Sequence, residues 1–81
     1  MHDTITFHQL EHVILQAGFK PQRVAGRHRV YGYPDGKTVV VLPYQSSKKP
    51  VPRMYIYAVR RILKENGLLS EEQFDRLISK T

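Results

Sequence analysis

A short turn between two β-rich runs constrains this chain more than any other feature. Residues 27–33, RHRVYGY, and 37–43, KTVVVLP, are rich in β-branched and aromatic side chains, and the turn sequence PDG lies between them. Proline presets φ and glycine supplies a positive φ, so this spacing predicts a β-hairpin. Residues 19–25, FKPQRVA, can form a further strand, in which Pro21 favours an edge position or a strand start. The sequence therefore predicts a three-stranded antiparallel meander.

Helix signals precede and follow the predicted strands. Thr6 and Gln9 fit a capping box before residues 7–17, whose apolar side chains recur at helical spacing. A second helix is predicted over residues 52–66, where a proline suits the first turn and a glycine follows the end. Serine and glutamine in another capping box precede a short third helix over residues 71–79. The predicted element order is thus α-β-β-β-α-α.

The length of 81 residues allows one domain with one modest core, so residues 1–81 are predicted to form a single domain. The element order predicts an α+β fold, a three-stranded antiparallel sheet with helices on one face, which leaves the other face for solvent or a ligand. Cysteine is absent, which excludes disulfides and thiolate zinc sites. Signal-peptide and membrane-spanning patterns are missing, so we expect a cytoplasmic protein without membrane contact.

Basic residues are concentrated in the middle of the chain. The formal net charge is +6 at pH 7. Residues 20–61 hold ten Lys or Arg and one acidic residue, Asp35, a net charge of +9, whereas the rest holds three basic and six acidic residues, a net charge of −3. A basic middle between acidic ends favours a surface that binds a polyanion. The alternative is a solvated basic surface.

The second predicted helix carries cations along one face. The cations recur at positions i, i+7 and i+11 of the helix, and a tyrosine stands at i+4. Cations at this spacing match the spacing of phosphates along a nucleic-acid backbone, and the tyrosine can stack on a base. Cations near a helix C-terminus also interact favourably with the helix dipole, so a solvated face is the alternative. The set is Arg53, Tyr57, Arg60 and Lys64, with Arg61 alongside.

Alternation along the second predicted strand divides its side chains between the two faces of the sheet. We expect the cationic and aromatic set on the open face, although tyrosines also pack well on half-buried sheets. The same alternation directs the remaining side chains of this strand, which include a histidine, toward the helices. A histidine in that position is partly shielded from solvent. The first set is Arg27, Arg29, Tyr31 and Tyr33, and the second is His28, Val30 and Gly32.

His28 stands among arginines and is the best candidate for chemistry. Histidine titrates near neutrality, so it can accept the proton of a ribose 2′-OH or donate one to the leaving 5′-oxygen, while arginines stabilise the phosphorane charge. A hydrogen-bonded structural histidine is the alternative. The other pair, His8 and His12, lacks the glutamate position of a metalloprotease helix, and no carboxylate cluster indicates Mg²⁺, so we expect no metal and no cofactor.

Three motifs carry a resemblance to a known family: QAGF, GRHRVYGYPDGKTVVVLP and AVRRILKENGLLSEEQF. From about residue 7 to 79, the chain resembles the HicA family, small mRNA-cleaving toxins of bacterial toxin-antitoxin pairs with a fold like a double-stranded RNA-binding domain. The resemblance implies mRNA as substrate and a HicB-like antitoxin as partner. It places Gly26 and His28 on the family motif Gly-(Ser/Thr)-His, whose histidine is catalytic, with Arg27 in place of the hydroxyl residue. Tyr44 stands where members often have a further histidine.

We therefore expect an RNA-binding toxin in which His28 is the general acid or base of metal-independent cleavage. Two alternatives stay open: a non-enzymatic RNA-binding module of the same fold, and a basic protein that binds an acidic partner. The residues predicted to bind RNA are Arg27, Arg29, Tyr31, Lys48, Lys49, Arg53, Tyr57, Arg60 and Arg61.

Overall fold

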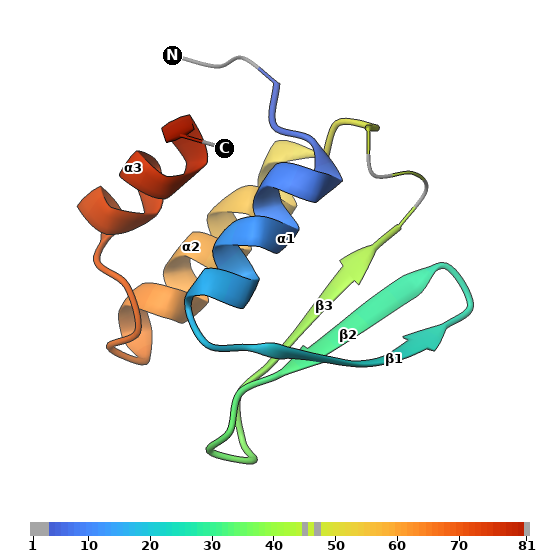
Figure 1. Ribbon diagram of the computed structural model, residues 1–81, viewed down its shortest axis with the longest axis horizontal. Coiled ribbons are helices and arrows are strands. Elements are labelled where there is room, and N and C mark those ends of the chain that lie inside the picture. Colours follow the sequence, from blue (N-terminus) through green and yellow to red (C-terminus); the bar gives the residue numbers. More distant parts are fainter. Residues whose placement is uncertain (1–3, 45, 47, 81) are drawn as a thin grey trace.

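Three helices and three strands follow each other in the predicted order. The computed structural model describes residues 4–44, 46 and 48–80. Its strands form one antiparallel sheet in the order β1-β2-β3 (Figure 1). The predicted α+β fold with the order α-β-β-β-α-α is therefore confirmed. The elements are α1 (Phe7–Gln16), β1 (Lys20–Ala25), β2 (His28–Gly32), β3 (Val39–Pro43), α2 (Arg53–Glu65) and α3 (Glu71–Lys80).

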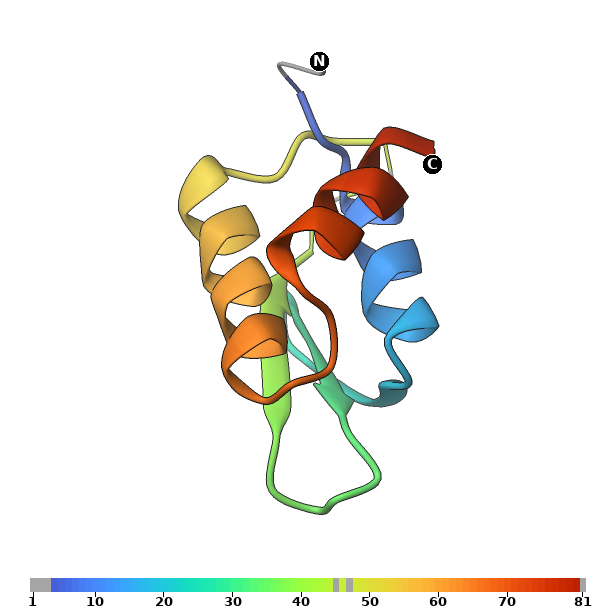
Figure 2. The same ribbon diagram turned by 90° about the vertical axis from the view of Figure 1, so that its left-hand side faces the viewer.

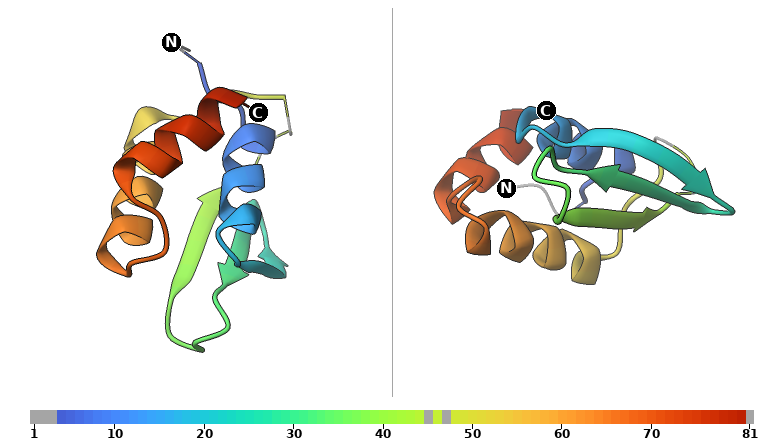
Figure 3. Two further views of the ribbon diagram at one scale, coloured as in Figure 1. Left: turned by 60° about the vertical axis from the view of Figure 1, so that its left-hand side comes forward. Right: turned by 90° about the horizontal axis from the view of Figure 1, so that it is seen from below.

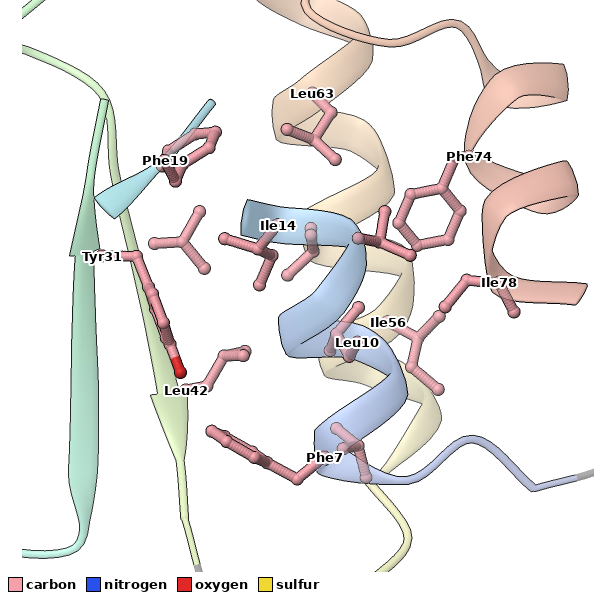
Figure 4. Packing of buried hydrophobic residues seen from close by; sticks show 14 residues of the cluster. Phe7, Leu10, Ile14, Phe19, Tyr31, Leu42, Ile56, Leu63, Phe74 and Ile78 are labelled. Atoms are coloured by element: carbon pink, nitrogen blue, oxygen red, sulfur yellow. The ribbon is translucent and has the colours of Figure 1, made fainter. Parts of the chain in front are cut away.

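The elements are arranged in three layers. Helices α1 and α2 cover one face of the sheet, and α3 packs against both helices on the side away from the sheet (Figure 2). Buried side chains from the sheet and from α1 and α2 fill the first interface, and Phe74 and Ile78 of α3 extend the core outward (Figure 4). None of the described helices lies over the other face of the sheet (Figure 3). We call this the outer face.

The predicted capping boxes begin two of the helices. Thr6 Oγ1 accepts a hydrogen bond from the Gln9 N–H at 3.2 Å, and the Gln9 side chain accepts one from the Thr6 N–H at 2.8 Å. Ser70 and Gln73 make the same pair of bonds at 3.1 and 2.9 Å before α3. Each box satisfies two backbone donors that a helix leaves unpaired.

The predicted hairpin connects β2 to β3. Asp35 Oδ1 accepts hydrogen bonds from the N–H groups of Lys37 and Thr38 at 2.8 and 2.9 Å, and Gly36 takes the positive φ of 73° that the turn requires. These bonds, that of Thr38 first, lower the pKa of Asp35. The two strands then pair without a register shift, from Gly32 opposite Val39 to His28 opposite Pro43.

The two faces of β2 are the reverse of the prediction. Tyr31 is 0% exposed and points into the core (Figure 4), and Arg29 contacts α1. His28 is exposed, on the opposite parity. The prediction assigned faces by polarity, whereas a tyrosine ring removes far more apolar surface from water when it is buried. The predicted open face is wrong for Arg29, Tyr31 and Tyr33.

In the described part of the chain, no helix is both long enough and apolar enough to cross a bilayer.

Candidate nucleic-acid interface

His28 is exposed on the outer face at the first residue of β2. Strands on both sides hold its backbone, since it pairs with Ala25 of β1 and with Pro43 of β3. The preceding turn contains Gly26 with a φ of 61°, in the left-handed region that glycine adopts without strain, and leaves Arg27 exposed. The prediction that His28 faces the helices is therefore wrong. Its backbone is fixed in the sheet while its ring is open to a ligand.

Apolar side chains dominate the outer face beside His28. Strand register groups it with Val30 of β2 and with the β3 residues Val39 and Val41, which are 46% and 49% exposed. Arg23 of β1 pairs with Val30 and brings a cation to the β1 side. The outer face thus combines an exposed histidine with an apolar strip and a basic margin, in place of the predicted rows of arginine and tyrosine.

Arg29 is held on the inner side of the sheet. Its guanidinium lies 3.6 Å from the Glu11 carboxylate and 3.9 Å from the ring centroid of Tyr44. Its Nε atom is buried and has no hydrogen-bond partner among the described residues. The ring of Phe7 lies edge-on to that of Tyr44, with the centroids 4.7 Å apart. Arg29 therefore joins α1 to the sheet through its ion pair with Glu11 and a cation–π contact with Phe7, whose ring centroid lies 5.6 Å from the guanidinium carbon.

Glu11 was not among the predicted site residues. It accepts a hydrogen bond from the Tyr31 hydroxyl and also faces Arg29. Burial, and then this hydrogen bond, raises the pKa of Tyr31 far above that of an exposed tyrosine. The sequence contained a signal for this contact with the sheet. Glu11 follows Phe7 by four residues and so lies beside the apolar face of α1.

Some cations of α2 are exposed, and others are paired with acidic residues of α3. Arg53 and Arg61 are exposed, and Tyr57, on the same side of the helix, is 61% exposed. Arg61 forms an ion pair with Glu65 one turn further along α2 at 3.0 Å. Such an exposed pair contributes little stability and leaves the guanidinium accessible. These three side chains fit the predicted phosphate-binding and stacking face.

Arg60 forms ion pairs with acidic residues of α3. Its Nε and Nη2 atoms donate to the two carboxylate oxygens of Asp75 at 3.0 and 2.8 Å, and its Nη1 atom donates to Glu71 at 3.0 Å. Lys64 lies 3.6 Å from the same Glu71 carboxylate. This two-pronged pairing uses the geometry with which a guanidinium would otherwise bind phosphate. Arg60, which was predicted to bind RNA, is therefore already paired with acidic residues of α3.

Lys48 and Lys49 are exposed in the loop between β3 and α2. The loop is tied to α1, because the Phe7 N–H donates a hydrogen bond to the Lys49 carbonyl oxygen at 3.0 Å. A pocket of about 360 Å³ lies beside it, lined by Lys49 and by apolar residues that include Phe7 and Tyr55. This loop therefore offers cations next to an apolar hollow.

Most of the predicted residues that are exposed lie where β2 begins, in the loop after β3 and on α2. β2 begins beside the end of β3, and the loop that follows β3 leads to the beginning of α2 (Figure 1). These residues are His28 and Arg27, then Lys48 and Lys49 in the loop, and Arg53, Tyr57 and Arg61 on α2.

Two further histidines of the described residues lie on α1. His8 and His12 are both exposed on α1. Within residues 4–44, 46 and 48–80, no three His, Asp or Glu side chains are grouped so that they could hold a metal ion.

Comparisons with known proteins identify the family. Residues 7–68 match the family described as the HicA toxin of bacterial toxin-antitoxin systems. The match runs from the first residue of α1 through α2, covers most of the chain and ends before α3. A search of curated proteins found no significant match. The chain therefore belongs to the HicA family of toxins from bacterial toxin-antitoxin systems.

Proposed function

We propose that this toxin binds RNA and cleaves mRNA in the cytoplasm, with His28 as the general acid or base and without need of a metal ion. The observation that carries the proposal is the exposed imidazole of His28 on the outer face, beside the exposed Arg27, in a member of a toxin family. Histidine exchanges protons readily near neutral pH, which suits either role. The fixed backbone of β2 limits the positions that the ring can take and so favours a defined approach to a phosphate.

The proposed reaction uses the RNA as its own nucleophile. The ribose 2′-oxygen attacks the adjacent phosphorus, the bond from phosphorus to the 5′-oxygen breaks, and the products are a 2′,3′-cyclic phosphate and a 5′-hydroxyl. Neutral His28 accepts the 2′-hydroxyl proton, or protonated His28 donates a proton to the leaving 5′-oxygen, and water serves the other role. The Arg27 guanidinium stabilises the charge that develops on the phosphorane oxygens.

The proposed RNA surface uses the exposed cations near His28 and along α2. Three of the residues predicted to bind RNA are not part of this proposed surface. Tyr31 is buried, Arg29 contacts Glu11 and Tyr44, and Arg60 pairs with α3. Phosphate contacts of this kind give binding that tolerates many sequences and weakens with salt. The remaining set is Arg27, Lys48, Lys49, Arg53, Tyr57 and Arg61.

Membership of this family implies an antitoxin partner. In the proposal this partner is a HicB-like protein with an acidic surface, because the toxin carries a net charge of +6. An acidic partner that shields the cations near His28 would block RNA binding and cleavage together.

A non-enzymatic RNA-binding module is the second candidate, favoured by the bulky Arg27 immediately before His28. A basic protein that binds an acidic partner is the third, favoured by the exposed valines of the outer face. Cleavage of a long labelled RNA by the purified protein in EDTA separates these candidates, with Arg27→Ser as the second sample. Activity in either sample supports the toxin; RNA binding without cleavage in both supports the module; and absence of RNA binding supports the third.

A further inference from the structure

The two edges of the sheet differ in how they are protected against pairing with another strand. The β1 edge carries Lys20 and Arg23, contains Pro21, and shifts register between Pro21 and Arg23. Charges, proline and an irregular register are the usual devices that block an edge. The β3 edge, VVVLP, has no charged residue, keeps a regular register along its whole length, and has its one proline, Pro43, only at its last residue. Of the two edges, β3 is therefore the one open to strand addition.

The backbone groups of β3 alternate between β2 and the free edge. Tyr33 N–H donates to the Thr38 carbonyl oxygen at 2.9 Å, and Tyr44 N–H donates to the Arg27 carbonyl oxygen at 2.6 Å. In an antiparallel pair every second residue makes such bonds, so the intervening Val39 and Val41 direct their N–H and C=O groups away from β2. Among the described strands, β3 pairs with β2 alone.

A pocket lies at the end of β3. Pro43, the last residue of β3, lines the pocket of about 360 Å³ described above, together with Phe7, Val51 and Tyr55. The walls are mainly apolar, and Lys49 supplies a cation. A strand that pairs along β3 thus reaches a hollow that accepts one of its side chains.

We propose that the antitoxin pairs one of its β-strands with the free edge of β3, inserts an apolar side chain into the pocket beside Pro43, and carries acidic residues on either side of the paired segment. The proposal rests on the family, which implies an antitoxin partner, and does not depend on RNA cleavage. Main-chain hydrogen bonds to Val39 and Val41 supply the affinity, and the pocket supplies the specificity.

Charge selects an acidic partner strand over a second copy of this chain. Lys37 lies just before β3, and Lys49 follows soon after it. In an antiparallel pair of two copies, the Lys37 end of one β3 would lie at the Lys49 end of the other. The chain also has a net charge of +6, so two copies repel each other while an acidic strand complements both ends.

Strand addition at β3 also explains how the toxin would be silenced. His28 pairs with Pro43, so an added strand is two strand spacings, about 10 Å, from His28 on the same sheet. The bulk of the partner beyond that strand then extends over the outer face. RNA is excluded from His28 without any contact between the antitoxin and the cations of α2.

Val41→Pro tests the pairing directly, with Val41→Thr as its matched control. Proline removes an N–H group that β2 does not use, and an edge strand accepts proline at such a position. The probe is the purified product of the gene next to that of the toxin, titrated by calorimetry. We expect Val41→Pro to bind at least about tenfold more weakly than Val41→Thr, because a backbone hydrogen bond is lost and its acceptor is left unpaired. Equal affinities for the two variants, or no complex with the wild-type toxin, would overturn the proposal.

Amide hydrogen exchange of the wild-type toxin tests the same pairing without a mutation. In the free protein the Val39 and Val41 amides should exchange fast and the Val40 and Leu42 amides slowly, since only the latter bond to β2. In the complex we expect the Val39 and Val41 amides to slow at least about tenfold. Fast exchange in a formed complex, or protection in the free toxin that grows with its concentration, would overturn the proposal, the second by revealing self-pairing. Neither readout involves RNA, so its failure is distinct from a failure of the catalytic proposal.

Discussion

The Tyr31 hydroxyl of β2 donates a hydrogen bond to the Glu11 carboxylate of α1, and the same carboxylate lies 3.6 Å from the Arg29 guanidinium. Residues on both sides of Val30 are thus tied to α1 on the inner side of the sheet. His28, directly before Arg29, projects from the outer side. The helix that closes the core therefore also fixes the strand on which the proposed catalytic residue stands.

Removal of the Tyr31 hydroxyl should destabilise the fold. Tyr31→Phe keeps the buried ring but leaves the Glu11 carboxylate without this donor, so we expect the free energy of unfolding to fall by about 1–2 kcal/mol. Tyr57→Phe is the matched control, because Tyr57 is 61% exposed. Urea denaturation followed by circular dichroism measures both. Equal stability of the two variants would contradict a structural role for this hydrogen bond.

The raised pKa of Tyr31 should appear as a loss of stability in alkali. A folded-state pKa above the ordinary value of 10.0 means that the folded protein retains the proton longer than the unfolded chain. This contribution is complete below pH 10 and is lost as the pH rises through the folded-state pKa. We expect the melting temperature of the wild type to fall more steeply than that of Tyr31→Phe above pH 10. Parallel curves for the two proteins would argue against this linkage.

Local sequence signals were enough to predict the helices and the hairpin. Contacts between residues far apart in the sequence determine which side chains are exposed at the candidate site. Thr6 with Gln9, Ser70 with Gln73 and the PDG turn act within four residues, and each is formed as predicted. The inward-facing Tyr31 is buried among core residues from other elements, and its hydroxyl bonds to Glu11, twenty residues away.

The role of Arg60 shows the same dependence on distant contacts. Its partner Asp75 lies fifteen residues along the chain. Residue pattern alone placed Arg60 with the exposed cations of its helix, because a helical wheel does not reveal which further element packs beside it. The paired helix α3 also lies outside the part of the chain that matches the family.

The ion pairs of Arg60 should matter for stability. Arg60→Ala removes bonds to Asp75 and Glu71, and we expect the free energy of unfolding to fall by roughly 1 kcal/mol, the upper end for partly exposed pairs. Arg76→Ala removes an exposed cation from α3 and serves as the control. Thermal melts compare the two variants. A larger loss of stability in Arg76→Ala than in Arg60→Ala would show that the contact between α2 and α3 does not depend on the ion pairs of Arg60.

RNA binding should distinguish Arg53 from Arg60. Each lost contact with single-stranded RNA reduces the slope of log K against log[salt] by about 0.7. We expect this change for Arg53→Ala and an unchanged slope for Arg60→Ala, since Arg60 is already paired with carboxylates. Fluorescence anisotropy with a labelled RNA at several salt concentrations provides the slopes. A flatter slope for Arg60→Ala alone would reverse this assignment of the α2 face.

The Asp35 turn should make the hairpin sensitive to acid. Hydrogen bonds from the Thr38 and Lys37 N–H groups lower the pKa of Asp35, so its contribution to stability is present above its ordinary value of 3.8 and is lost as the pH falls through the folded-state pKa. Asp35→Ala should lower the melting temperature at pH 7, and the difference from the wild type should shrink below pH 4. A difference that does not vary with pH would show that the charge of Asp35 is not involved.

Cleavage of a labelled RNA in EDTA by His28→Ala, beside the wild type, tests whether His28 is the catalytic residue. His12→Ala is the matched control, because His12 is equally a surface histidine but lies on α1. We expect the wild type and His12→Ala to cut the RNA to products with 2′,3′-cyclic phosphate ends. We expect His28→Ala to be slower by on the order of 10²-fold or more while it binds the RNA with nearly unchanged affinity. Cleavage at the wild-type rate by a folded His28→Ala protein would show that His28 is not the catalytic residue.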